Sequence, residues 1–96
     1  MKSYAEAVAL HGSDFQLADL HGVPLTLKLT EVQDKGSNDR FEQFTLLLKG
    51  PLNVPLSQGI YRLEHEVAGV VDWMLVPIAR DVEGYTYEAV FNLMKN

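Results

Sequence analysis

The chain has 96 residues, 47% of them hydrophobic and 22% charged, which is the composition of one ordinary globular domain and not of a disordered segment. Eight Lys and Arg against 13 Asp and Glu give a formal net charge of -5, which argues against nucleic acid or an anionic membrane surface as partner, because both attract clustered basic side chains. The absence of Cys excludes disulfides, thiolate catalysis and Cys-ligated metals.

The N-terminal segment SYAEAVAL, residues 3–10, is the one good helical candidate in the chain. Ser3 can cap the helix, and Glu6 lies three residues later as in a capping box. Tyr4 and Val8 then share one face of the helix. A short helix of about two turns is expected here.

The same N-terminal residues lack the apolar run of a signal peptide. No segment of the chain approaches the ~20 apolar residues that a membrane span needs. We therefore expect a soluble, cytoplasmic protein.

After the helix the apolar residues recur at every second position, which is the period of a half-buried strand. Strands are expected over residues 15–17, 23–32 and 41–50, with a turn at His21-Gly22 and irregular connections over 33–40 and 51–58. The cleanest strand is the second, which places Val23, Leu25, Leu27 and Leu29 on one face. Its alternation slips at Thr30-Glu31, which indicates a bulge or the end of the strand.

The last third of the chain predicts two hairpins, because EVAG and DVEG each place Gly at the end of a short turn. The turns predict facing pairs of Leu63 and Leu93 with Trp73, of Tyr61 and Phe91 with Leu75, and of Tyr87 with Ala79. The inner face of a three-stranded meander, with residues 70–78 in the middle, is then formed by Tyr61, Leu63, Trp73, Leu75, Tyr87, Phe91 and Leu93. Pro77 is expected opposite Gly59, where the pairing with the preceding strand begins.

These elements predict a mainly β fold with about six antiparallel strands in a meander and one short N-terminal helix, in a single small domain over residues 1–96. The sheet is expected to form a curled sheet or a small, partly open barrel. The barrel-like form is favoured because every strand has one strongly apolar face and only one short helix is available to cover it.

The meander also has apolar residues on its outer face, which should be polar at a free surface. They are Met74, Val76, Ile78 and Val90. The predicted pairing places Val76 opposite Val90 and Ile78 opposite Glu88. Two interpretations stay open. The N-terminal helix, or the connection around Val54 and Leu56, covers these residues, or they form an interface with a second copy or another protein subunit.

The sequence contains no recognisable catalytic or metal site. His11, His21 and His65 lack the spacing of metal ligands, and His65 reads as an inward, hydrogen-bonded structural residue. No Ser lies in a nucleophile elbow or in a Ser–His–acid spacing. Tyr61, Trp73 and Phe91 could line a small-ligand pocket, although core packing is the simpler interpretation. We expect no enzyme activity, no cofactor and no metal.

Three motifs resemble a family of small uncharacterised bacterial domains of unknown function. They are F-x-L-L-x-x-G-P at residues 44–51, Q-G-x-Y-x-L-x-H-x-x-x-G at 58–69, and V-P-I-x-x-D-x-x-G-x-x-Y-E-A-V-F-N at 76–92. The resemblance covers most of the chain, although Asp72-Trp73 departs from the apolar-Phe pair of the family. It supplies no catalytic residues and implies a role in a phage-tail-like or other multi-subunit assembly.

Together these observations predict a non-enzymatic structural or protein-interaction module. We expect it to form a homo-oligomer, or to bind another protein subunit, through the outer apolar residues. The alternative is a small-ligand-binding β-barrel module.

Overall fold

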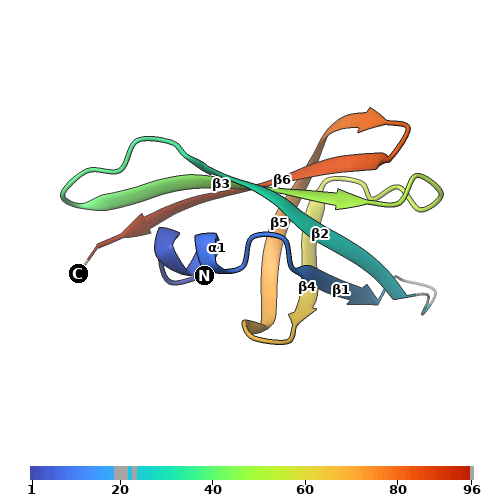
Figure 1. Cartoon of the computed structure of the whole chain (residues 1–96), viewed down its shortest axis with the longest axis horizontal. Helices are drawn as coiled ribbons and strands as arrows, with labels where there is room; N and C mark the ends of the chain where they lie inside the picture. The colour runs from blue at the N-terminus through green and yellow to red at the C-terminus, as the bar shows by residue number, and fades with distance from the viewer. Residues whose placement is uncertain (19–21, 23, 96) are drawn as a thin grey trace.

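The computed structural model describes residues 1–18, 22 and 24–95, and it is mainly β, as predicted (Figure 1). The elements are α1 (Tyr4–Ala9), β1 (Asp14–Ala18), β2 (Pro24–Asp34), β3 (Phe41–Gly50), β4 (Gly59–His65), β5 (Gly69–Asp81) and β6 (Gly84–Met94). The short N-terminal helix and the six antiparallel strands of the prediction are confirmed. The predicted turn residue His21 and inward residue Val23 lie outside the described residues.

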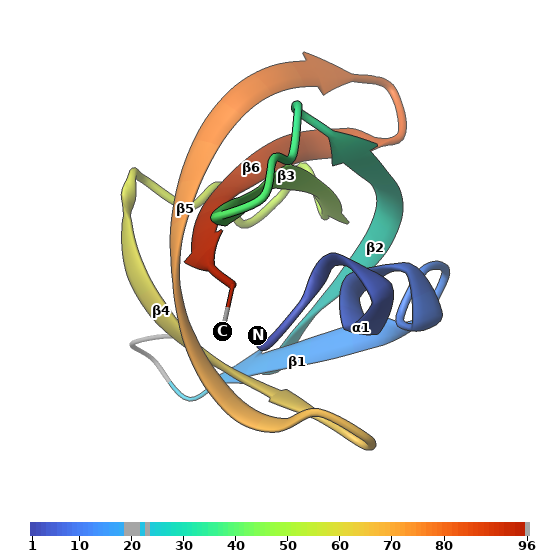
Figure 2. The same ribbon diagram turned by 90° about the vertical axis from the view of Figure 1, so that its left-hand side faces the viewer.

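The six strands form one sheet that closes in a ring, in the order β1-β2-β3-β6-β5-β4 (Figure 2). Each half of the chain is a sequential three-stranded meander, but β3 pairs with β6, from Phe41↔Met94 to Gly50↔Tyr85, and not with β4. The ring closes between β1 and β4 through the pair Gln16↔Glu64. The connection over 51–58 therefore carries the chain from one meander to the far side of the other.

Two strands bend and change partners along their length. β2 pairs with β1 up to Lys28 and with β3 from Lys28 onward, and its register shifts between Leu29 and Glu31. The predicted slip in this strand is therefore confirmed. β5 pairs with β4 up to Leu75 and with β6 from Val76 onward. Each of these two strands therefore leaves one neighbour and joins another partway along its length.

Helix α1 closes one end of the ring by packing on β2 and β3. Ser3 caps it as predicted, because its Oγ accepts the N–H of Glu6 at 3.0 Å. Ala7 and Leu10 are buried, and the Tyr4 ring packs edge-on against Phe44, with 5.8 Å between centroids. In the described part of the chain no helix is long and apolar enough to cross a membrane.

The connection over 51–58 is anchored to the core. The N–H of Leu56 donates to the Tyr87 hydroxyl at 2.9 Å, and Val54 and Leu56 pack against buried residues. Burial raises the pKa of Tyr87, because the charged phenolate is poorly solvated there.

The register of the β4–β5 hairpin differs from the prediction by two residues. Tyr61 lies opposite Trp73, and Leu63 lies opposite Val71. The turn consists of residues 66–68, and Gly69, with φ of 76°, already pairs with His65. Sequence reasoning had placed this Gly inside the turn.

The β5–β6 hairpin is displaced for two reasons. Asp81 pairs with Gly84 across a two-residue turn, and the pairing skips Ile78 in a bulge, so Pro77 lies opposite Tyr87. Pro77 therefore does not face Gly59, which pairs with Leu75. The predicted partner of Leu93 is also wrong, because Leu93 pairs with Glu42 of β3.

The predicted inner face is nevertheless confirmed. A displacement by an even number of residues leaves every side chain on its own face of the sheet. Leu63, Trp73, Leu75 and Tyr87 are buried, while Tyr61, Phe91 and Leu93 are partly buried against the same core.

Candidate functional site

The outer patch, defined as Met74, Val76, Ile78 and Val90, remains uncovered. Met74 is 47% exposed, Ile78 48% and Val90 66%, while Val76 is partly buried. Helix α1 packs on β2 and β3, and the 51–58 connection packs on the core. The interpretation that one of these segments covers the patch is therefore wrong.

The arrangement of the outer patch differs from the predicted one. Val76 lies opposite Glu88, and Val90 lies opposite Thr45 of β3. The predicted pairs of Val76 with Val90 and of Ile78 with Glu88 are wrong because the hairpin register is displaced. The patch also extends onto β4 through Ile60, which pairs with Met74 and is 70% exposed. In the segment IYRLEH, residues 60–65, Ile60 alternates with the inward-facing Tyr61 and Leu63, so this pattern could have assigned Ile60 to the outer face.

The three aromatic residues of the alternative ligand pocket belong to the core. Trp73 packs against Phe15 and Phe91, with centroid distances of 5.0 and 5.3 Å. The Tyr61 hydroxyl donates to the Ser57 carbonyl at 2.6 Å. Trp73 is thus a core residue, and Tyr61 and Phe91 are partly buried against the core.

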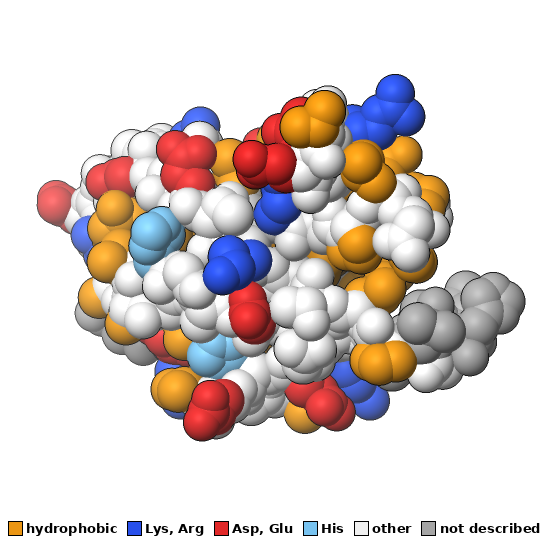
Figure 3. Space-filling view, turned by 45° about the vertical axis from the view of Figure 1, so that its right-hand side comes forward, with side chains coloured by type: hydrophobic (Ala, Val, Ile, Leu, Met, Phe, Trp, Pro, Cys, Tyr) orange, Lys and Arg blue, Asp and Glu red, His pale blue; other side chains and the backbone are white. Residues whose placement is uncertain are grey.

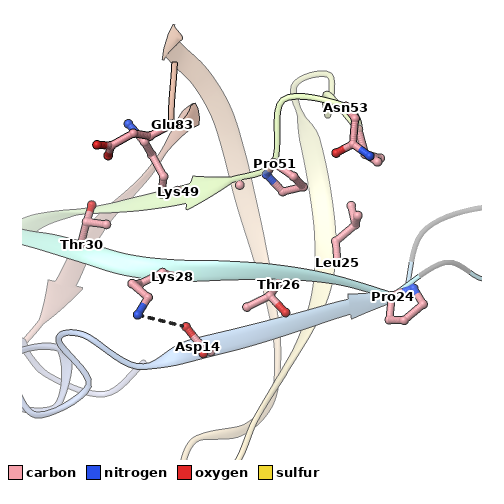
Figure 4. A pocket seen from close by; sticks show the side chains of 12 residues that line it. Asp14, Pro24, Leu25, Thr26, Lys28, Thr30, Lys49, Pro51, Asn53 and Glu83 are labelled. Atoms are coloured by element: carbon pink, nitrogen blue, oxygen red, sulfur yellow. Dashed lines mark ion pairs between the residues drawn. The ribbon is translucent and has the colours of Figure 1, made fainter. Parts of the chain in front are cut away.

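A groove of about 860 Å³, lined by both apolar and polar residues, opens instead where β2 and β3 separate (Figure 4). It is lined by Asp14, Pro24, Leu25, Thr26, Lys28, Thr30, Lys49, Gly50, Pro51, Asn53, Val54 and Glu83. The groove exists because β2 residues before Lys28 pair only with β1, while β3 ends at Gly50. Sequence reasoning missed it because it depends on this divergence of neighbouring strands.

Both lysines of the groove have a carboxylate partner within the chain. Lys28 and Lys49 are cross-strand neighbours, and their ammonium groups lie 3.9 Å from Asp14 and 2.7 Å from Asp81. Figure 3 shows basic and acidic side chains intermixed over the face that it presents. Neither a free anion site nor a free cation site follows from this arrangement.

Lys49 lowers the pKa of Asp81 by hydrogen bonding to its carboxylate, and the N–H groups of the following turn add to the effect. This interaction is fully present above the ordinary pKa of Asp and is lost as the pH falls through the lowered value. We expect Lys49→Met to raise the pKa of Asp81 toward its ordinary value, measured by NMR titration of the carboxyl carbon. Lys28→Met is the matched control and should leave the titration unchanged. Equal titrations in the wild type and Lys49→Met would contradict the assignment.

Ser13 and His65 come together although they are far apart in the chain. His65 Nε2 lies 2.7 Å from Ser13 Oγ. Sequence reasoning expected an inward His65 with a hydrogen bond, but it did not identify Ser13 as the partner. Only the pairing of β1 with β4 around the ring brings the two residues together.

The hydrogen bonds of Ser13 and His65 argue against Ser13 as a nucleophile with His65 as its general base. His65 Nδ1 accepts the N–H groups of Val67 and Ala68 at 2.9 and 3.1 Å, so the ring proton lies on Nε2. The Ser13 hydroxyl donates to the Leu10 carbonyl. Nε2–H therefore donates to Ser13 Oγ, whereas a general base must accept the hydroxyl proton.

Two aspartates lie in turns and bond to the backbone there. Asp34 and Asp81 accept N–H groups of their own turns, as predicted for Asp81. Among residues 1–18, 22 and 24–95, no group of three or more His, Asp or Glu side chains is placed to hold a metal ion.

A family model described as a domain of unknown function (DUF6916) matches residues 3–91. The chain belongs to this family. The predicted membership of a family of small domains of unknown function is thus confirmed. In this DUF6916 domain the matched residues begin at the N-cap of α1 and end within β6. Comparisons with curated proteins and with solved structures found no match.

The three candidate sites of this DUF6916 domain are the groove, the Ser13–His65 pair and the outer patch. They differ in how many of their side chains already contact other residues of the chain. The two lysines of the groove have carboxylate partners, and Ser13 and His65 are held in a structural network. The side chains of the outer patch have no such engagement, since three of its four residues are about half exposed or more. The outer patch is therefore the best candidate surface.

Proposed function

We propose that this domain is a non-enzymatic protein-interaction module that self-associates through the outer patch, as a cytoplasmic subunit of a multi-subunit assembly. The observation that carries the proposal is the exposure of Ile60, Met74, Ile78 and Val90. Apolar side chains that gather on one face gain free energy when a partner removes them from water. The phage-tail-like character of the assembly stays a prediction from the family resemblance.

The surroundings of the patch support this role. Arg62 and Asp72 form a two-bond ion pair beside it, with distances of 3.1 and 3.4 Å, and Glu88 adjoins Val76 on β6. An apolar centre with a polar rim is the usual composition of a protein interface. Because both copies would use the same surface, a two-fold dimer is the simplest assembly.

We expect the molar mass of the wild-type chain to rise toward that of a dimer with concentration, measured by light scattering. Met74→Asp should weaken association at least about tenfold, because the interface would bury an unpaired carboxylate. Val67→Asp is the matched control, since Val67 is 81% exposed in the β4–β5 turn. Both variants should melt close to the wild type. A wild-type monomer at every concentration, or equal effects of the two variants, would count against the proposal.

The alternative, a small-ligand-binding module, is supported by the groove and not by the aromatic residues named from the sequence. The groove has polar side chains from three strands and a volume suited to a small ligand. Lys49 hydrogen-bonds to Asp81 and Lys28 lies 3.9 Å from Asp14, so an anionic ligand would compete with these carboxylates for both lysines. We therefore favour the interaction module.

A further inference from the structure

The second half of β6 has a partner on one side only. β3 pairs with β6 up to Phe41↔Met94, whereas the pairing of β5 with β6 stops at Val76↔Glu88. Figure 1 shows β6 running on past β5 toward the C-terminus beside β3. Helix α1 packs on β2 and β3 and makes no comparable contact with β6. Residues 89–94 are therefore an edge strand.

The backbone groups at this edge can be assigned to particular residues. The N–H of Lys95 donates to the Arg40 carbonyl, which precedes β3, so the odd-numbered residues of β6 bond toward β3. Backbone groups alternate in direction along a strand. Val90, Asn92 and Met94 therefore direct their N–H and C=O groups away from β3. In the part of the chain that the structure describes, the β5 register reaches none of these three residues.

The edge lacks the features that prevent strands from pairing with other chains. Residues 89–94 contain neither Pro nor a charged side chain. Val90 is 66% exposed and Met94 74%, and Asn92 is exposed as well. Natural edge strands are usually protected by Lys, Pro, a bulge or a covering segment. This edge therefore presents six uncharged, mostly apolar residues.

We propose that β6 pairs antiparallel with β6 of a second copy of this chain, about a two-fold axis at Asn92. The proposal rests on the self-association proposed above and specifies its geometry. Asn92 of one copy lies opposite Asn92 of the other, and Val90 lies opposite Met94. One N–H and one C=O on each of these residues then find partners, and the sheets of the two copies become continuous.

The self-complementarity of the segment argues for a second copy and against an unrelated peptide. Val90 and Met94 lie at equal distances from Asn92, so the two-fold axis pairs apolar with apolar side chains on both sides. This register uses all three outward-directed residues and spares Glu88, which already pairs with Val76. Glu88 precedes the segment and Lys95 follows it, so antiparallel pairing sets unlike charges at each end of the paired segment, with their side chains on opposite faces of the sheet. A parallel arrangement would bring like charges together.

Amide hydrogen exchange of the wild-type chain tests the geometry residue by residue. In the dimer we expect slow exchange at Val90, Asn92 and Met94, with protection falling at least about tenfold on dilution to monomer. Phe91 and Leu93 bond to β3 and should stay protected at both concentrations. Fast exchange of the three even-numbered amides under dimeric conditions overturns the proposal.

Asn92→Pro provides a second test, because it removes an N–H that points away from β3 and leaves the β3 ladder intact. We expect it to weaken association at least about tenfold while the monomer melts close to the wild type. A dimer that persists in Asn92→Pro but is lost in Met74→Asp overturns edge pairing and leaves the proposed function standing. Loss of the dimer in Asn92→Pro alone supports edge pairing and removes the β5 residues of the outer patch, Met74, Val76 and Ile78, from the interface. A monomeric wild type overturns both.

Discussion

Gly84→Ala is expected to lower the free energy of unfolding by roughly 3–5 kcal/mol, combining overpacking with backbone strain. Gly84 is buried at the start of β6 with φ of 149°, a conformation that side chains rarely adopt. A Cβ there would overlap the backbone carbonyl of Gly50, which belongs to the paired end of β3. Because the obstacle is backbone and not a flexible side chain, β3 and β6 would have to move apart.

Gly69→Ala is the matched control for this prediction. Gly69 also begins a strand after a hairpin turn and has a positive φ of 76°, but a Cβ there meets nothing within 4 Å. Gly69→Ala should therefore lower the free energy of unfolding by only about 1–2 kcal/mol, which is the cost of the left-handed backbone conformation. Urea unfolding followed by tryptophan fluorescence measures both variants. Equal losses in the two variants would show that crowding against Gly50 does not contribute.

The faces of the strands could be predicted from the sequence because they depend only on alternation. Leu63, Trp73 and Leu75 are buried as expected, and the outer positions of Met74 and Ile78 are exposed. The facing partners could not be predicted in the same way, because they depend on how each turn closes. In the β4–β5 hairpin the His65 imidazole accepts two N–H groups of the turn, and periodicity carries no information about such a bond.

The candidate surfaces were predictable to different degrees. The four residues of the outer patch are apolar at positions that alternation assigns to solvent, so the sequence alone identifies them. The groove and the free edge of β6 arise where a strand leaves one partner for another, at Lys28 in β2 and at Val76 in β5. Such divergence depends on how the strands pair around the closed ring, and a local pattern in the sequence does not predict it.

His65→Ala is expected to lower the free energy of unfolding by roughly 2–4 kcal/mol, from lost hydrogen bonds and lost packing. The imidazole joins the β4–β5 turn to Ser13, which lies 52 residues away, before β1. Its ring also packs against Phe15 with 4.5 Å between centroids. The loss should therefore loosen the seam of the ring, where β1 and β4 share the single pair Gln16↔Glu64.

Ser13→Ala separates the hydrogen-bonding role of His65 from its packing role. It removes only the acceptor of Nε2–H and should cost about 1 kcal/mol. The double variant should cost less than the sum of the single variants, because each removes the same bond. Nitrogen NMR of the wild-type ring should show the proton on Nε2. A proton on Nδ1, or strictly additive losses, would refute the network, and the first result would reopen a role for His65 as a base toward Ser13.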